Sequence, residues 1–543
     1  MKRTLLLLLL VTAMPFLLFA GTNTSLSLDS GAYIYQILDY AELKGIIPKI
    51  KQEKPYVNSL VYSNLQLILE QDDKLTDSEL KIINNYLDNN EIDGGFAFSA
   101  VAESDNNLLL SDLSHPHSIN GLGLQVEGDV FDFLSLNVVF SMLLDRTNEE
   151  AFIPYSFYKT WDHHHMDPET RVDSSTEEFA ISNRSSEELA AATEDGSAYV
   201  RIGRFNRNWG PGEHSLLLSD TARPFIGLES GFPLSDLAYI TTVTGSLGST
   251  VGADTSEEQK MLSAHRLTIY PADWLSFAFY ESVVFGKRFE LAYISPISIY
   301  MVSQMGTAGD RDNSTMGLEF ELNPVNWFNV YGEFFVDEIE HDKFDQLFTY
   351  VKNIFAYKAG VEAPVPVLPF AVARFQYTKL EPYVYTHYAE SRYYFAYNQE
   401  ININYTNDGA CIGYPLQPNS DQFLVNFSFI PAAGFEVDVD ISYIRHGDNP
   451  DAEDDEYLIM GDIDEDLDYS NVDEYPEKDF LNDGIYEKIL SFAADVSYTF
   501  KKVPVSLNLG YGFAWSRNYN NIEGNTNFKN IITIGGSYKQ QLW

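Results

Sequence analysis

Residues 435–443 read Phe-Glu-Val-Asp-Val-Asp-Ile-Ser-Tyr, with an apolar or aromatic side chain at every second position and a polar one between. Successive side chains of a β-strand point to opposite faces of the sheet, so this stretch predicts a strand with one apolar and one polar face. A charged side chain that faces lipid costs on the order of a few kcal/mol. In a membrane strand, Glu436, Asp438 and Asp440 must therefore face a polar lumen.

The same alternation recurs in hairpins along the chain, each closed by a short turn. Strand pairs of this kind occupy residues 122–142, 316–336, 423–443 and 492–513. Trp274 and Trp327 lie beside such turns, as expected for an aromatic girdle at the membrane–water boundary. We predict an all-β transmembrane fold, an antiparallel outer-membrane β-barrel of roughly 16–18 strands. A soluble β-sandwich or β-helix is the alternative, but it does not explain strands with carboxylates on one face.

Long polar segments alternate with the short turns, which is the arrangement of outer loops and periplasmic turns in outer-membrane barrels. We expect the barrel and its extracellular loops to occupy residues 96–543. The segments expected to face outward are residues 146–196, 340–353, 381–413, 447–488 and 516–527.

The first twenty residues have the order of a secretory signal peptide. Lys2 and Arg3 precede an apolar run that includes six consecutive leucines, and the small residue Ala20 ends it. The alternative is a retained membrane helix, but the run falls short of the ~20 apolar residues that a spanning helix needs. We therefore expect export, cleavage after Ala20 and insertion in the bacterial outer membrane.

Residues 21–95 differ from the rest because their apolar residues follow helical spacing. The pattern predicts helices at residues 33–41, 57–71 and 76–87. Thr76 and Glu79 have the spacing of a capping box at the start of the third helix. We expect a periplasmic helical domain packed at the mouth of the barrel, and a small helical plug or platform is the alternative.

The composition excludes several classes of protein. The net charge of −44 excludes DNA and RNA as partners, because phosphate binding requires clustered Lys and Arg. Cys411 is the single cysteine, so the chain has neither a disulfide framework nor a thiolate metal site. We expect a monomer whose apolar outer surface contacts outer-membrane lipid.

An arginine-rich motif stands out in a chain that is poor in arginine. Its strand breaks at Trp209-Gly210-Pro211-Gly212, where glycine and proline allow and fix unusual backbone angles. Guanidinium groups bind carboxylates in a forked geometry and also suit ligand recognition. The alternative role for the arginines is to neutralise carboxylates of neighbouring strands in the lumen. The candidate ligand-binding residues are Arg201, Arg204, Arg207, Trp209 and Arg223.

This motif, with Ser219-Asp-Thr-Ala-Arg-Pro224 after it, resembles the Wzi-type capsule-assembly outer-membrane proteins. Residues 312–319, 331–338 and 45–48 fit the same family. The resemblance implies a barrel of about eighteen strands with a periplasmic helical bundle. It also implies a lectin-like role, in which the protein holds exported polysaccharide at the cell surface.

Two segments are candidate metal sites. His163-His164-His165 are adjacent, whereas Zn²⁺ ligands usually have wider spacing, so a solvated loop is the preferred interpretation. Asp462, Asp464 and Asp466 lie in an acidic run and are candidate Ca²⁺ ligands, with an unstructured charged loop as the alternative. We expect no other cofactor.

No hydrolase or phosphate-binding motif is present: the sequence has no Gly-x-Ser-x-Gly, no His-Glu-x-x-His and no P-loop. We therefore expect a non-enzymatic surface protein that binds or organises capsular polysaccharide or exopolysaccharide. An outer-membrane porin for small solutes is the first alternative, and a barrel enzyme that acts on lipid or glycan is the second.

Overall fold

The computed structural model of the chain describes most of the sequence. The predicted signal peptide, residues 1–20, and the histidines at 163–165 lie outside the described residues. The described residues are 25–28, 33–89, 96–131, 134–146, 148, 179–222, 224–248, 260–286, 288–308, 312–389, 401–407, 410–447, 477–478, 480–481, 485–501 and 503–543.

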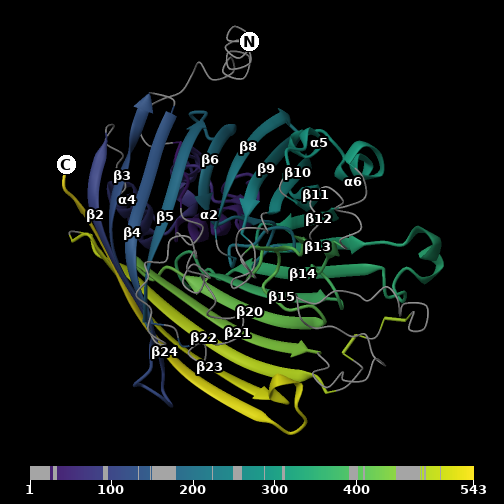
Figure 1. Cartoon of the computed structure of the whole chain (residues 1–543). Helices are drawn as coiled ribbons and strands as arrows, with labels where there is room; N and C mark the ends of the chain where they lie inside the picture. Colours follow the sequence, from purple (N-terminus) through teal and green to yellow (C-terminus); the bar gives the residue numbers. More distant parts are fainter. Residues whose placement is uncertain are drawn as a thin grey trace.

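Within these residues, eighteen antiparallel strands close into one barrel, as predicted (Figure 1). Neighbours in the barrel are neighbours along the chain, and the last strand pairs with the first. The strands are β2 (Ala97–Leu109), β3 (His117–Phe131), β4 (Leu134–Arg146), β5 (Phe179–Ala192), β6 (Tyr199–Phe205), β8 (Phe225–Ser235), β9 (Ala238–Leu247), β10 (Lys260–Ala272), β11 (Leu275–Gly286), β12 (Asn313–Val325), β13 (Phe328–Glu338), β14 (Ile354–Pro364), β15 (Val372–Leu380), β20 (Ser420–Phe429), β21 (Phe435–His446), β22 (Glu487–Thr499), β23 (Val505–Arg517) and β24 (Thr526–Gln541).

The period-two pattern sorts the side chains between the two faces of the wall. Apolar residues such as Leu124, Phe140 and Leu318 are exposed on the outside. On β21, Asp438 and Asp440 accept hydrogen bonds from Asn426 Nδ2 on β20, at 3.2 and 2.9 Å, and the Asn426 side chain is buried in the interior. These carboxylates therefore face the lumen, as their alternation predicts.

Short turns gather at one end of the barrel. β10 and β11 are joined through residues 273–274, and β12 and β13 through residues 326–327. Trp274 and Trp327 are 50% and 64% exposed beside these turns. Their position fits the predicted aromatic girdle, because an indole prefers the boundary between apolar and aqueous phases.

Two predicted outer loops require correction. Residues 146–196 include the barrel strand β5, which the sequence pattern missed because its outward positions carry polar residues such as Ser185 and Glu187. Residues 381–413 do not form an outward loop, because described residues such as Tyr385, Tyr405 and Ile412 are buried inside the barrel. Their aromatic content stabilises a folded interior segment instead of a solvated loop.

The N-terminal part contains the three predicted helices, α2 (Ile34–Leu43), α3 (Asn58–Leu69) and α4 (Asp77–Asn89). The capping box at α4 is confirmed. The backbone N–H of Glu79 donates to Thr76 Oγ1 at 3.3 Å, and the Thr76 N–H donates to Glu79 Oε2 at 2.7 Å. No helix among the described residues is long and apolar enough to cross a membrane.

The helical part packs against the short-turn end of the barrel. The buried face of α2 contacts Phe370, Val372 and Ile430, which lie around the turns that follow β14 and β20. Gln36 Nε2 also donates to the Phe370 carbonyl at 2.6 Å. The helices of this part lie at the end of the barrel, and its connecting segment enters the lumen.

That connecting segment is β1 (Glu53–Lys54), which pairs with β7 (Asn208–Trp209) inside the barrel. Lys51 precedes it, and the Lys51 ammonium lies 4.5 Å from the centre of the Tyr199 ring. Burial lowers the pKa of Lys51 to about 7, and the nearby Glu53 carboxylate opposes this shift. These contacts connect the helical part to the lumen side of the barrel wall.

Candidate functional site

The arginine-rich motif leaves the barrel wall after β6 and turns into the lumen. This first inner segment, residues 206–222, is closed on itself where the Trp209 N–H donates to the Leu218 carbonyl at 2.9 Å. The Trp209 side chain is fully buried in the same cluster as Leu216 and Leu217. The interior thus contains an ordered, apolar core at this level.

Gly212 shows why the motif contains glycine. Its φ of +74° belongs to the left-handed region, and a Cβ there would lie 2.5 Å from the Tyr331 ring and from Gln376 Oε1. The segment can approach β13 and β15 this closely only because residue 212 lacks a side chain.

We expect Gly212→Ala to lower the free energy of unfolding by roughly 2–4 kcal/mol, because backbone strain and overpacking add. Urea unfolding in lipid vesicles, followed by tryptophan fluorescence, measures the loss. Gly524→Ala is the matched control, since Gly524 has a φ of +75° and nothing within 4 Å of its Cβ position. Equal losses in the two variants would refute the close approach at Gly212.

Glu229 of β8 joins two arginines of the motif in a buried cluster. Arg207 Nε donates to Glu229 Oε2 at 2.7 Å, and Arg201 Nε donates to Glu229 Oε1 at 3.1 Å. All three side chains are at most 1% exposed. A carboxylate between two guanidinium groups satisfies charges that would be costly to bury alone.

Glu333 of β13 fixes the far end of the first inner segment. It lies 2.7 Å from the Lys358 ammonium and accepts hydrogen bonds from Tyr280 Oη at 3.0 Å and from the Leu216 N–H at 3.0 Å. Ser215 Oγ donates to the same carboxylate at 3.1 Å. One lumen carboxylate therefore neutralises a lysine and holds the backbone of residues 215–216.

Arg266 of β10 anchors the helical part in the same way. It donates to Glu53 of β1 at 2.7 Å and also pairs with Glu319 of β12. Arg374 of β15 similarly pairs with Glu213 of the first inner segment and with Glu362 of β14. The interior network therefore connects the wall, the helical part and the motif.

A second inner segment covers the first from the side of the long connections. It comprises the described residues of 381–419, between β15 and β20. Tyr385 Oη donates to the Leu216 carbonyl and Tyr405 Oη to the Leu217 carbonyl, each at 2.8 Å. Backbone groups buried away from water need such partners, so the tyrosines stabilise the interior position of the motif.

The structure brings together only part of the predicted binding set. Arg201, Arg207 and Trp209 are enclosed by protein, which favours the alternative that these arginines neutralise lumen carboxylates of neighbouring strands. Arg204 lies 3.5 Å from Glu187 and is partly exposed. Arg223 and the Ca²⁺ candidates Asp462, Asp464 and Asp466 lie outside the described residues. Within the described part of the chain, no cluster of three or more His, Cys, Asp or Glu could hold a metal ion.

One cavity lies in the lumen of the barrel, next to strands β2–β5 and β22–β24. It has a volume of about 750 Å³ and polar lining residues such as Glu103, Gln125 and Arg184. Ser27 and Pro55 of the N-terminal part also line it, so it lies next to the part of the interior that the helical part enters.

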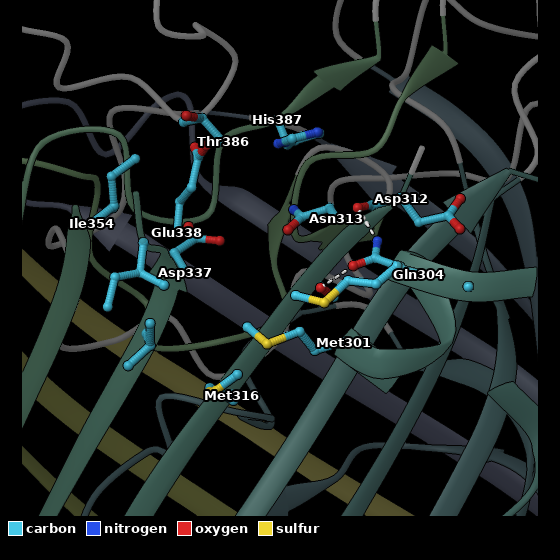
Figure 2. A pocket seen from close by; sticks show the side chains of 15 residues that line it. Met301, Gln304, Asp312, Asn313, Met316, Asp337, Glu338, Ile354, Thr386 and His387 are labelled. Carbon is cyan, nitrogen blue, oxygen red and sulfur yellow. Dashed lines mark hydrogen bonds between the residues drawn. The ribbon is translucent and has the colours of Figure 1, made fainter. Parts of the chain in front are cut away.

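A second pocket lies at the end of the barrel away from the short turns, where the long connections leave the strands (Figure 2). We call it the rim pocket, and its volume is about 570 Å³. Figure 2 shows Glu338 and Thr386 on the left, Asn313 and Gln304 on the right, and His387 above Asn313. Met301 and Met316 form its floor in this view.

The rim pocket combines groups that suit a sugar. Its carboxylates, amides and imidazole can accept or donate hydrogen bonds to hydroxyl groups, and its methionines supply adaptable apolar contacts. Gln304 is itself fixed, because its side chain bonds the Asp312 carbonyl and Ser314 (Figure 2). Sequence reasoning missed this pocket, since its residues come from five separate segments of the chain.

Comparisons with known proteins agree with the fold. Residues 191–530 match the family described as capsule assembly protein Wzi. The structure also resembles that of Wzi, described as an outer membrane protein involved in group 1 capsule assembly in Escherichia coli and as a carbohydrate-binding β-barrel. That likeness has a TM-score of 0.57 at 12% identity and covers 96% of this chain and 99% of the other.

Two further solved structures show weaker likenesses. OprD of Pseudomonas aeruginosa has a TM-score of 0.41 at 8% identity, over 83% of this chain and 97% of its own. OccAB2 of Acinetobacter baumannii has a TM-score of 0.45 at 9% identity, over 83% and 98%. No match to a curated protein was found. Because the family match spans more than half of the sequence, the chain belongs to the Wzi capsule assembly protein family.

Proposed function

We propose that the protein binds exported polysaccharide at the bacterial cell surface and organises it there without catalysing a reaction. The observation that carries this proposal is the family match over residues 191–530 on a closed barrel with an ordered interior. The Escherichia coli relative is described as a carbohydrate-binding β-barrel of the outer membrane. On the basis of family membership, we extend the outer-membrane location and the carbohydrate ligand to this chain.

The apolar outer surface supports a location in the outer membrane, with acyl chains around the strands. In this setting residues 1–20 are removed on export, and residues 21–95 lie in the periplasm at the short-turn end. The rim pocket then faces the outside of the cell. We propose a monomer, because the barrel closes on itself and needs no second chain to pair its strand edges.

The rim pocket is the proposed saccharide site. Pockets of ~300–1,000 Å³ hold small ligands, and its volume falls in that range. Asp312, Asp337 and Glu338 make it acidic, so it suits hydroxyl-bearing or amino sugars better than carboxylated ones. An acidic polymer would require a bridging cation, which is the role we propose for Ca²⁺ if binding depends on it.

A porin for small solutes is the alternative, and its support is the polar lumen cavity. The two inner segments and β1 argue against it, because their buried side chains fill the interior on the side of β9–β20. Planar-bilayer conductance separates the two functions, since a porin conducts ions steadily and a filled barrel does not.

We expect the double variant Glu338→Ala and His387→Ala to weaken binding of the producing cell's surface polysaccharide by at least ~10-fold, because each loss of a polar partner costs ~1–3 kcal/mol. Titration of purified, detergent-folded protein, with Ca²⁺ or with chelator, measures the affinity. The matched control removes Asp112 and His115, an exposed acid–imidazole pair between β2 and β3 whose atoms lie 2.7 Å apart. Equal affinity in both double variants would exclude the rim pocket as the site.

A further inference from the structure

The connection between β11 and β12 folds back over the outside of the barrel wall. Its described residues 288–308, which we call the flap, contain α5 (Leu291–Ile294), α6 (Tyr300–Ser303) and a π-helical turn (Gln304–Ala308). Figure 1 shows α5 and α6 beside β10–β12, at the upper right. The flap thus lies against the wall, whereas an ordinary outer loop extends into water.

The alternation on β11 shows which side the flap covers. Tyr280 and Ser282 point into the lumen, where they contact Glu333 and Tyr405. Their neighbours Glu281, Val283 and Phe285 therefore point outward.

Although these side chains point outward, all of them are at most 1% exposed, because the flap lies on them. Tyr293 and Tyr300 of the flap pack with Val283 and Phe285 in one buried cluster. The ring centres of Phe285 and Tyr293 are 5.0 Å apart. The flap is thus fixed to the outer face of the wall.

The flap also covers a polar pair on that outer face. His265 Nε2 of β10 lies 3.3 Å from Glu281 Oε2 of β11. The Tyr300 N–H donates to Glu281 at 2.9 Å, and the Tyr300 ring lies 4.4 Å from the imidazole. Without the flap this carboxylate would face the surroundings of the barrel, at a cost of a few kcal/mol in lipid.

The outer surface of the flap is apolar. The residues 288–308 contain two charged side chains, and Arg288 pairs with Asp312 while Glu290 caps α5 through the Ala292 N–H. Outside the rim pocket, the exposed apolar side chains of the flap have exposed fractions of 55–85%, and they are Phe289, Leu291, Ile297, Ile299 and Val302. So many exposed apolar side chains within one short connection indicate an interaction site.

We propose that the outer surface of the flap lies in the outer leaflet of the membrane and contacts lipid acyl chains. The apolar belt of the barrel leads directly to it, since Phe277 and Phe279 of β11 and Phe320 of β12 are exposed on the same side. The flap extends this belt and replaces a wall surface that contains a His–Glu pair. The proposal rests on the outer-membrane location proposed above.

Site-directed spin labelling tests the proposal. A nitroxide at Ile297→Cys or Val302→Cys, in a Cys411→Ala background reconstituted in phospholipid vesicles, reports its collisions with oxygen and with a water-soluble nickel chelate. Both sites are exposed, so labelling leaves the core intact. We expect oxygen accessibility to exceed nickel accessibility several-fold, as at Leu318→Cys on the belt.

Ile522→Cys, on the exposed connection between β23 and β24, is the aqueous control. If the flap labels behave like Ile522→Cys while Leu318→Cys remains lipid-exposed, the flap proposal is wrong and the membrane location stands. If Leu318→Cys is also aqueous, the membrane location itself fails. Low accessibility to both reagents at the flap would show a protein partner there and would overturn contact with lipid.

Discussion

Replacing Glu229 by Gln is expected to lower the free energy of unfolding by about 3–5 kcal/mol, because it leaves two buried guanidinium groups without a carboxylate. Arg201 and Arg207 both donate to Glu229, and none of these side chains reaches solvent. Removal of one charge from such a cluster is far more costly than removal of an exposed ion pair. Urea unfolding from lipid vesicles measures the difference.

Glu103→Gln is the matched control, because Glu103 pairs with Arg184 beside the lumen cavity and both side chains are about 30% exposed. That variant should lose less than ~1 kcal/mol. If Glu229→Gln does not fold, Glu229→Gln combined with Arg207→Gln should recover folded barrel, since one unpaired cation is then removed. Similar stability of Glu229→Gln and Glu103→Gln would contradict the buried cluster.

Replacing Glu333 by Ala is expected to release the first inner segment from the wall and to lower the free energy of unfolding by about 3–5 kcal/mol. The variant leaves Lys358 unpaired and removes the acceptor of the Leu216 N–H. Hydrogen exchange of a peptide that spans residues 213–219 should therefore accelerate by one to two orders of magnitude, in line with the ~1–3 kcal/mol for an unsatisfied buried donor.

Glu333→Gln separates the two roles of this side chain. The amide oxygen keeps an acceptor for Leu216, but it does not neutralise Lys358. We expect Gln to retain most of the exchange protection and to lose most of the stability. Unchanged exchange in Glu333→Ala would show that other contacts hold the inner segment.

The barrel could be predicted because its signal is local and repeated. On β12, the alternation of Leu318 and Phe320 with Glu319 and Glu321 determines which face of the strand points into the lumen. The capping box of Thr76 and Glu79 is equally local, and the structure confirms it. Such patterns need no knowledge of distant contacts.

The interior could not be predicted to the same depth. Glu229 pairs with Arg201 across strands β6 and β8, but nineteen residues of the first inner segment and its return separate the two strands in sequence. The polar and aromatic composition of the second inner segment is typical of an outer loop. Its interior position depends on Tyr405 and Tyr385, which donate hydrogen bonds to distant backbone carbonyls of the motif. The rim pocket likewise depends on contacts among five segments.

The amount of cell-attached polysaccharide tests the central claim most directly. We would compare a strain without the gene, the same strain with the wild-type gene, and the strain with the Glu338→Ala and His387→Ala variant, separating attached from released polymer. The account predicts that polysaccharide of unchanged chain length is released without the protein, is retained with the wild type and is poorly retained with the variant. Equal attachment in all three strains would contradict it, and altered chain length would indicate an enzyme.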